Sequence, residues 1–257
     1  TSWNPVANGR VEKIVLDGST VYASGSFRII GSQSRNRIAA LDGTTGLATT
    51  WNPNADSTVS NMVLDGGTIY ACGVFTTIGG QTRNMIAGLD KTSGLATSLN
   101  LAGVTYSLGA IAIYGNTLFT GGDMKSIGGK IRNKIAALNA TTGEATSWNP
   151  NANDVVNTIV VNGSNVYAGG SFTNIGGQTR NRIAAIDTTT GSATSWNPNA
   201  NGVVNDIIAD VYSVYVAGSF QNIGGQPRNR LASIGKTDGL ASAFNPNVSS
   251  DVYTIKL

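Results

Sequence analysis

The chain has 257 residues, of which only 12% are charged, and a formal net charge of +3. It contains 33 Gly, no His and a single Cys, Cys72, which excludes a Ser-His-Asp triad, other His-based acid–base chemistry, an intrachain disulfide and most metal sites. No apolar run approaches the roughly 18 residues that a membrane-spanning helix needs, so we expect no membrane insertion. Because residue 1 is Thr and no signal-like apolar segment follows it, we expect a processed chain or a fragment.

A unit of about 48 residues is repeated five times along the chain. Val-Tyr-Ala-Ser-Gly-Ser-Phe at residues 21–27 has counterparts at 69–75, 118–124, 166–172 and 214–220. An Ile-Gly-Gly segment or a close variant and an Arg-Asn pair follow each of them, and each copy closes on Trp51, Leu99, Trp148, Trp196 or Phe244. The repeats run approximately over 11–58, 59–106, 107–154, 155–202 and 203–250, within a single domain spanning residues 1–257.

Each copy carries four strand signals, which in the first copy cover residues 11–16, 21–27, 37–41 and 47–51. The first strand ends at Asp17-Gly18, a dipeptide typical of tight hairpins. A Gly-containing turn precedes the fourth strand, and Asn52-Pro53 ends it, since Pro cannot donate to a strand ladder. Four antiparallel strands in 40–50 residues are typical of a propeller blade.

The sequence therefore predicts an all-β fold, a single β-propeller of four-stranded antiparallel blades. Five complete units favour five blades, which leaves surplus strands at 1–5 and 252–257. Six blades would be possible only if residues outside this chain supplied a missing middle pair of strands. Small residues recur in the second strand, as at Cys72 and Gly73, and predict close approach between blades or near the axis. We expect first or second strands to line that axis, and Cys72 to be a small filler.

The segment Ala40-x-Asp42-x-x-Thr45-Gly46 followed by Trp51 resembles the tryptophan-docking motif of pyrroloquinoline-quinone-type propellers. In that motif the Trp of one blade packs on the Ala and Gly of a neighbouring blade. The spacing from Gly46 to Trp51 differs by one residue, so the resemblance implies a packing role and no quinone binding. Structural docking is accordingly assigned to Trp51, Trp148, Trp196 and Phe244, with Trp51, Trp148 and Trp196 buried between blades.

The whole unit, with Gly-Ser-Phe, Ile-Gly-Gly, Arg-Asn, Ala-Ala-Leu-Asp and Trp-Asn-Pro-Asn-Ala-Asn, resembles the delta-60-type repeats of large bacterial secreted or surface proteins. The resemblance covers nearly the entire chain. It implies an extracellular or cell-surface location and does not name an activity.

Polar side chains that recur before and within the Arg-Asn pair are the candidate ligand contacts, because amides can hydrogen-bond hydroxyls and arginines can bind acidic groups. They are Gln33, Arg35, Asn36, Gln81, Arg83, Asn84, Gln178, Arg180, Asn181, Gln226, Arg228 and Asn229. The alternative is that these residues only close the long hairpin, and repetition in every copy favours that structural role. If they bind, the binding should be multivalent and individually weak. Copy three, with Leu99-Asn100-Leu101 and Lys130-Ile131, has lost the shared surface chemistry.

Two other chemistries receive less support from the sequence. Basic residues are distributed around the ring by the repeat rather than gathered in one stripe, so we expect no nucleic-acid partner. A glycoside hydrolase needs two carboxylates at a fixed separation, and Asp123 and Glu144 are the acids that break the repeat. No catalytic residue and no metal or organic cofactor is predicted.

We therefore expect a non-enzymatic extracellular scaffold or binding module that recognises a glycan or a protein surface. A glycan-active hydrolase on a five-bladed propeller is one alternative. The other is a structural element of a repeat array, in which the surplus terminal strands complete a neighbour or a longer parent chain.

Overall fold

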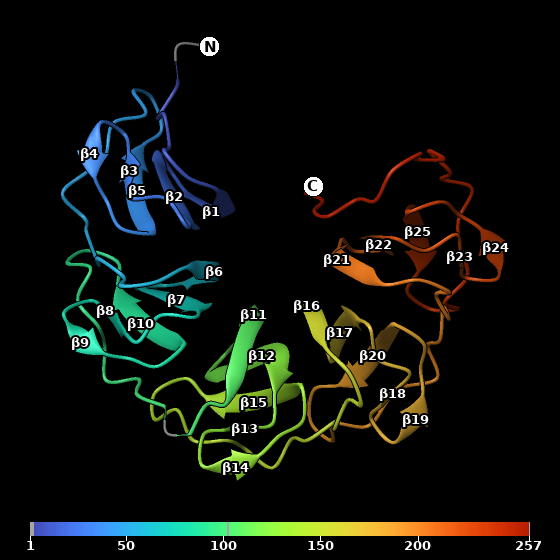
Figure 1. Ribbon diagram of the computed structural model, residues 1–257. Helices are drawn as coiled ribbons and strands as arrows, with labels where there is room; N and C mark the ends of the chain where they lie inside the picture. The colour runs from blue at the N-terminus through green and yellow to red at the C-terminus, as the bar shows by residue number, and fades with distance from the viewer. Residues whose placement is uncertain (1–2, 102, 257) are drawn as a thin grey trace.

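The computed structural model describes residues 3–101 and 103–256, and these residues form five similar all-β blades (Figure 1). In blade 1, β1 (Val11–Asp17), β2 (Thr20–Gly25) and β5 (Ile38–Asp42) form an antiparallel sheet in the order β1-β2-β5. A separate hairpin pairs β3 (Ile29–Ile30) with β4 (Gln33–Ser34). Among the described residues, no helix is long and apolar enough to cross a bilayer.

The other blades repeat this arrangement. Blade 2 contains β6 (Val59–Asp65), β7 (Thr68–Gly73), β8 (Thr77–Ile78), β9 (Gln81–Thr82) and β10 (Ile86–Asp90). Blade 3 contains β11 (Tyr106–Tyr114), β12 (Thr117–Met124), β13 (Ser126–Ile127), β14 (Lys130–Ile131) and β15 (Ile135–Asn139). Blade 4 contains β16 (Val156–Asn162), β17 (Asn165–Gly170), β18 (Asn174–Ile175), β19 (Gln178–Thr179) and β20 (Ile183–Asp187). Blade 5 contains β21 (Val204–Ala209), β22 (Ser213–Gly218), β23 (Asn222–Ile223), β24 (Gln226–Pro227) and β25 (Leu231–Gly235).

The expected fourth strand is much shorter than the sequence predicts. In blade 1 it is reduced to one antiparallel bridge between Leu41 and Ala48 and the neighbouring hydrogen bond from Thr49 N to Ala40 O (2.9 Å), and the other four blades have the equivalent bridge. The reason is local. The Thr49 hydroxyl accepts a hydrogen bond from Trp51 N (3.3 Å), and the chain then turns so that the indole enters the space between two blades.

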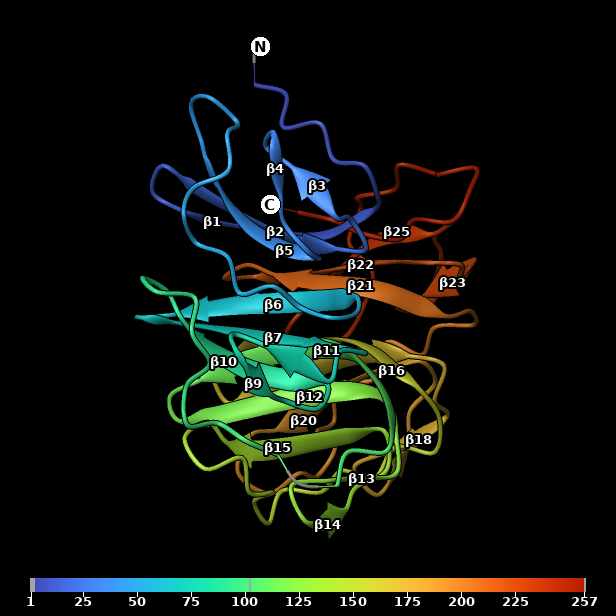
Figure 2. The same cartoon turned by 60° about the vertical axis from the view of Figure 1, so that its left-hand side comes forward.

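The first strands of successive blades lie next to one another around the centre of the molecule, in the order β1, β6, β11, β16, β21 (Figure 1). Figure 2 shows the same arrangement turned by 60°, with β1 and β2 of blade 1 near the top and β14 of blade 3 at the bottom. The first strands are thus the innermost strands. Each of them contains a register shift against the second strand, as between Val11 and Lys13 in β1. A bulge strengthens the local twist of a strand, which suits strands that converge on an axis.

The apolar core is divided into clusters that lie between neighbouring blades. One cluster joins Phe119 and Ile135 of blade 3 to Val156 and Ile159 of blade 4, around Trp148. Equivalent clusters join blades 1 and 2, blades 2 and 3, and blades 4 and 5. Blades 2, 3 and 4 are therefore stabilised mainly by burying both faces against their neighbours, whereas blades 1 and 5 each bury one face in this way.

The docking tryptophans occupy these junctions. Trp148 is buried, lies edge-on to Phe119 with the ring centroids 5.0 Å apart, and donates from Nε1 to the carbonyl of Asp187 in the next blade (2.8 Å). A Cβ placed on Gly191 of that blade would lie 3.5 Å from the indole, so the ring packs directly over this glycine. Trp51 and Trp196 are buried in the same way and donate to Asp90 O and Gly235 O.

Phe244 differs from the docking assignment. It is 44% exposed and lies edge-on to Tyr215 of its own blade, with ring centroids 6.2 Å apart. The physical reason is that, among the described residues, no further blade packs against this edge of blade 5. The five blades form an arc, and among the described residues no contact comparable to those between successive first strands joins β21 to β1 (Figure 1).

The described parts of the two surplus terminal segments lie at opposite ends of the arc of blades. Residues 3–5 lie against blade 1, and residues 252–256 run beside β21 without being part of a regular strand. Thr1, Ser2 and Leu257, which belong to the same predicted segments, lie outside the described residues.

Candidate functional site: a groove between neighbouring blades

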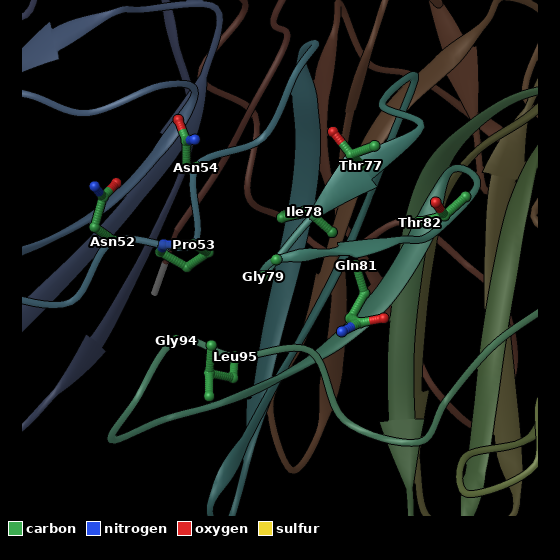
Figure 3. Close-up of a pocket in the computed structure, with 11 residues that line it drawn as sticks. Asn52, Pro53, Asn54, Thr77, Ile78, Gly79, Gln81, Thr82, Gly94 and Leu95 are labelled. Atoms are coloured by element: carbon green, nitrogen blue, oxygen red, sulfur yellow. The ribbon is translucent and has the colours of Figure 1, made fainter.

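A groove of about 590 Å³ lies between blades 1 and 2 (Figure 3). We call it the blade 1/2 groove, and its lining residues are Asn52, Pro53, Asn54, Thr77, Ile78, Gly79, Gly80, Gln81, Thr82, Gly94 and Leu95. Figure 3 shows the Gln81 side chain extending from the β8–β9 hairpin toward the turn that carries Gly94 and Leu95, with Asn52 and Asn54 on the other side. The lining carries amides, hydroxyls and backbone groups and no charged side chain.

The groove is shaped by a two-residue hairpin. Gly79 and Gly80, which join β8 to β9, have φ angles of +61° and +76°, and a turn with two positive φ angles matches the twist of the flanking strands. Gly79 N donates to the carbonyl of Pro53 in the preceding blade (2.7 Å), and Gly79 O accepts from Ala96 N (2.9 Å). A Cβ on Gly79 would lie 2.5 Å from Ala96 N, so no other residue fits there without a shift.

The same bond between the hairpin and the Asn-Pro loop recurs along the chain. Glycine N donates to proline O in the pairs Gly31–Pro5, Gly79–Pro53, Gly176–Pro150 and Gly224–Pro198, at 2.6–2.7 Å. Blade 3 departs from this pattern because Leu101 replaces the proline. The framework of the groove is therefore present at four places.

The five arginines of the Arg-Asn pairs line neither this groove nor the groove between blades 3 and 4, and they are held by backbone carbonyls. Arg83 donates from Nη1 to Thr82 O (2.8 Å) and from Nη2 to Thr97 O (2.7 Å). Arg35, Arg132, Arg180 and Arg228 make the equivalent pair of bonds. The Nε atom of each is buried and finds no partner among the described residues. These guanidinium groups tie the hairpin to the segment that replaces the fourth strand.

The asparagines of the Arg-Asn pairs also make scaffold contacts. Asn36 donates from Nδ2 to Asn54 Oδ1 (2.7 Å) in the loop that begins the next unit, and Asn54 has a φ of +55°. Asn tolerates this left-handed conformation better than most residues do. Asn133, Asn181 and Asn229 make the same bond to Asn151, Asn199 and Asn247. The counterpart for Asn84 is Ala102, which lies outside the described residues.

The glutamines are the predicted contact residues that the structure leaves on the surface. Gln33, Gln81, Gln178 and Gln226 are all exposed and occupy the same position in the hairpin. Within residues 3–101 and 103–256, the side-chain amide of Gln81 makes no hydrogen bond to the rest of the chain. The structure thus brings Gln81 together with Asn54 in one groove and separates it from Arg83. The prediction that the Gln, Arg and Asn side chains contact a ligand stays a prediction.

Leu95 lines the groove and was not singled out by the sequence analysis. It is 61% exposed, and Leu47 and Leu240 occupy the same repeat position and are exposed as well. The signal that could have found it is an apolar residue in the turn before the short fourth strand of three blades, where blades 3 and 4 carry the polar Glu144 and Ser192. Leu95 gives the groove a small apolar wall beside its amides.

A second groove lies between blades 3 and 4 and has a different character. It is lined by Lys125, Asn133, Lys134, Asn151, Ala152, Asn153 and Asn174. Lys134 is bonded to the carboxylate of Asp123, and Lys125 lies 5.5 Å from the centre of the Tyr106 ring. Neither Asp123 nor Glu144 lines either groove, so the two acids that break the repeat do not meet in one of these sites.

The turn acids of the third strand are held by local hydrogen bonds. Asp90 accepts from Ser93 N (2.7 Å), Ser93 Oγ (2.8 Å) and Thr92 N (3.1 Å), and these bonds lower the pKa of its carboxyl, the bond from Ser93 N most. Asp42 and Asp187 are bonded in the same way, and their pKa values are lowered for the same reason. In blade 3, Asn139 takes the place of the acid and accepts from Thr141 N and Thr142 N (both 2.9 Å).

Comparison with known proteins supports the fold. A family model described as a β-propeller domain of unknown function (DUF5122) matches residues 165–189 and 213–232. No curated protein sequence matches. The structure is similar to a chain in the crystal structure of the mitotic checkpoint complex, with a TM-score of 0.65, 15% identity, and coverage of 95% of this chain and 67% of that one.

Two further solved structures show the same architecture. The Pan2 WD40 domain of Neurospora crassa matches with a TM-score of 0.59, 10% identity, and coverage of 94% of this chain and 70% of that one. The computationally designed Ika8 protein matches with a TM-score of 0.57, 12% identity, and coverage of 90% of this chain and 69% of that one. The fold is a repeat β-propeller, and identities this low say nothing about a ligand.

Proposed function

We propose that the chain is a non-enzymatic extracellular binding module that contacts uncharged, hydroxyl-bearing glycans at the grooves between its blades. A β-propeller is a rigid scaffold that presents loops and hairpins for binding, which supports a binding or scaffold role in general. The observation that carries the finer proposal is the blade 1/2 groove, where the free amide of Gln81 faces an apolar wall at Leu95.

The chemistry of the lining favours a neutral ligand. Amide and hydroxyl groups both donate and accept hydrogen bonds, as sugar hydroxyls do. The lining contains no charged side chain, so an acidic ligand would gain little there. It also contains no carboxylate, whereas glycoside hydrolysis needs two, and the proposal therefore assigns binding and no bond cleavage. The extracellular setting rests on the resemblance of the repeat unit to repeats of secreted and surface proteins.

Repetition makes the binding multivalent. The hairpin and Asn-Pro framework recurs with Gln33, Gln178 and Gln226, so a repeating polysaccharide could engage several grooves of one molecule. Individually weak sites gain avidity when one ligand chain spans more than one of them. We therefore expect long glycans to bind more tightly than the same sugar as a short oligomer.

The test is a titration of neutral oligosaccharides followed through the backbone amide signals. We expect shifts at Gly79, Gly80 and Gln81 and at their counterparts, and little dependence on salt. The variant Gln81→Ala should lose the shifts of its own groove, and the matched control Lys130→Ala, at the same position of blade 3, should leave them unchanged. Absence of shifts with every sugar, or shifts confined to the innermost strands, would contradict the proposal.

A further inference from the structure

The two ends of the chain carry the same part of the repeat. Phe244-Asn-Pro aligns with Trp3-Asn-Pro, and Val252 and Ile255 align with Val11 and Ile14. Trp3 donates from Nε1 to the carbonyl of Asp42 (3.2 Å), just as Trp148 donates to Asp187 O in the next blade (2.8 Å). The segment around Trp3 therefore docks on blade 1 as the closing segment of a blade that precedes it.

The other end lies where the first strand of a following blade belongs. Asn205 of β21 donates from Nδ2 to Val252 O (3.0 Å), which repeats the bond from Asn157 of β16 to Val204 O of β21 (3.1 Å). The carboxylate of Asp206 fixes the segment further, because its Oδ2 accepts from Thr254 Oγ1 and Ile255 N, both at 3.0 Å. Residues 252–256 are thus held against blade 5 by the contacts that join neighbouring first strands.

Both edges of the arc expose residues that are buried at every internal junction. In blade 1, Val11 is 37% and Ile14 48% exposed, whereas their counterparts Val156 and Ile159 in blade 4 are 0% and 6% exposed. At the other edge Phe244 is 44% exposed, whereas Trp148 is 3% exposed. These surfaces are the same two faces with which the five blades already pack on one another.

We infer that the gap in the arc takes one further blade of this same repeat, to which this chain contributes the innermost strand and the outermost segment. The occupant is a β-hairpin segment with the sequence pattern of this repeat. It is the counterpart of residues 17–48, the part of the repeat that neither terminal segment supplies. Filling the gap in this way closes the ring and buries the apolar surfaces at both edges of the arc. A closed ring of blades leaves only short, protected strand edges.

The internal junctions show how such a hairpin fits. Side chains at the positions of Val166 and Phe172, which pack around Trp148 between blades 3 and 4, would cover Phe244. On its opposite face, side chains at the positions of Phe119 and Ile135 would cover Ile14, as they cover Ile159. The contacts within the internal junctions therefore show which side chains of the added hairpin would pack on blade 5 and which on blade 1.

The experiment is to extend the chain after Leu257 with a copy of residues 17–48 and to compare it with the original chain. We expect the extended chain to be monomeric by light scattering and to melt about 5 °C or more above the original. Backbone amides of residues 11–16 should exchange with solvent about 10-fold or more slowly in the extended chain.

The control is Ile14→Asp in both backgrounds. It should have little effect in the original chain, where Ile14 is exposed, and should remove the gain in melting temperature in the extended chain. An appended segment that exchanges like an unfolded chain, with no gain in melting temperature, would overturn the inference. A dimer of the original chain that Ile14→Asp dissociates would also overturn it, since the occupant would then be a second copy.

Discussion

At the residue scale, side chains at the same repeat position contribute differently to the free energy of unfolding in different blades. Trp148 is buried between two blades and hydrogen-bonded across their junction, whereas Phe244 stands at the open edge. The sequence shows both as closing aromatics of a unit. Only the presence or absence of a neighbouring blade separates their contributions to stability.

Trp148→Ala should lower the free energy of unfolding by about 3–5 kcal/mol, the usual cost of truncating a buried large aromatic. Phe244→Ala, the matched control, should cost about 1 kcal/mol or less, because much of the ring already meets solvent. Chemical denaturation of both variants measures the difference. Equal losses would show that Phe244 is buried in solution and that the edge is covered.

The turn acids give the fold a defined dependence on pH. The pKa values of Asp42, Asp90 and Asp187 are lowered by hydrogen bonds, chiefly from the backbone N–H three residues on. A group with a lowered folded-state pKa stabilises the fold above its unfolded pKa, which is about 3.9 for Asp, and this contribution is lost as the pH falls through the folded pKa.

Replacing all three with Asn should therefore lower the melting temperature at pH 7, and the difference from the original chain should begin to shrink below about pH 4 and vanish as the pH falls through the lower folded-state pKa values. Blade 3 already folds with Asn139 at this position, so the turn itself accepts the amide. Melting curves at several pH values measure the effect. A difference that stays the same from pH 7 to pH 3 would mean that the carboxylates are not stabilised in the folded state.

At the element scale, the junction between two blades depends on small residues in the second strand. A Cβ on Gly169 of β17 would lie 2.4 Å from Val204 Cγ1 of the next blade, closer than van der Waals contact allows. The close approach expected from the run of small residues is therefore located at the junction of blades 4 and 5.

Gly169→Ala should destabilise the protein by about 1–3 kcal/mol through overpacking. Gly67→Ala, the matched control, should be neutral or slightly stabilising, because Gly67 has open space around its Cα and no positive φ. The double variant Gly169→Ala/Val204→Ala should lose less stability than the sum of the two single variants, since Val204→Ala removes the nearest clashing methyl group. Losses that simply add would show that the clash with Val204 is not the source of the strain.

Much at this scale could be predicted from the sequence. The repeat positions gave the strands, the Asp-Gly hairpin and the location of Trp148, because each depends on residues close in sequence or on a spacing that recurs. The shortening of the fourth strand could not be predicted, since it depends on the hydrogen bond from Trp51 N to the Thr49 hydroxyl and on the space that the indole finds between two blades. For the candidate site, Gln81 was predicted, but the wall formed by Leu95 depends on how two turns meet in space.

At the scale of the whole molecule, five blades form an arc whose first and last members do not pack on each other. The sequence predicts two terminal segments outside a five-bladed ring but not where they lie, because the angle between blades is set by side-chain packing at the junctions. The structure places residues 3–5 against blade 1 and residues 252–256 against blade 5, and these two blades also carry the exposed Ile14 and Phe244.

Thiol labelling of Ile14→Cys and Met62→Cys tests the open arc most directly. The two residues occupy the same position of the repeat, but Ile14 is 48% exposed and Met62 is 1% exposed. The native Cys72 should not react with the label in the folded protein, because it is fully buried and burial raises the pKa of its thiol to about 12. We expect Ile14→Cys to react as fast as an exposed thiol and Met62→Cys to react only after unfolding. Equal protection of both thiols in the folded monomer would contradict the open arc.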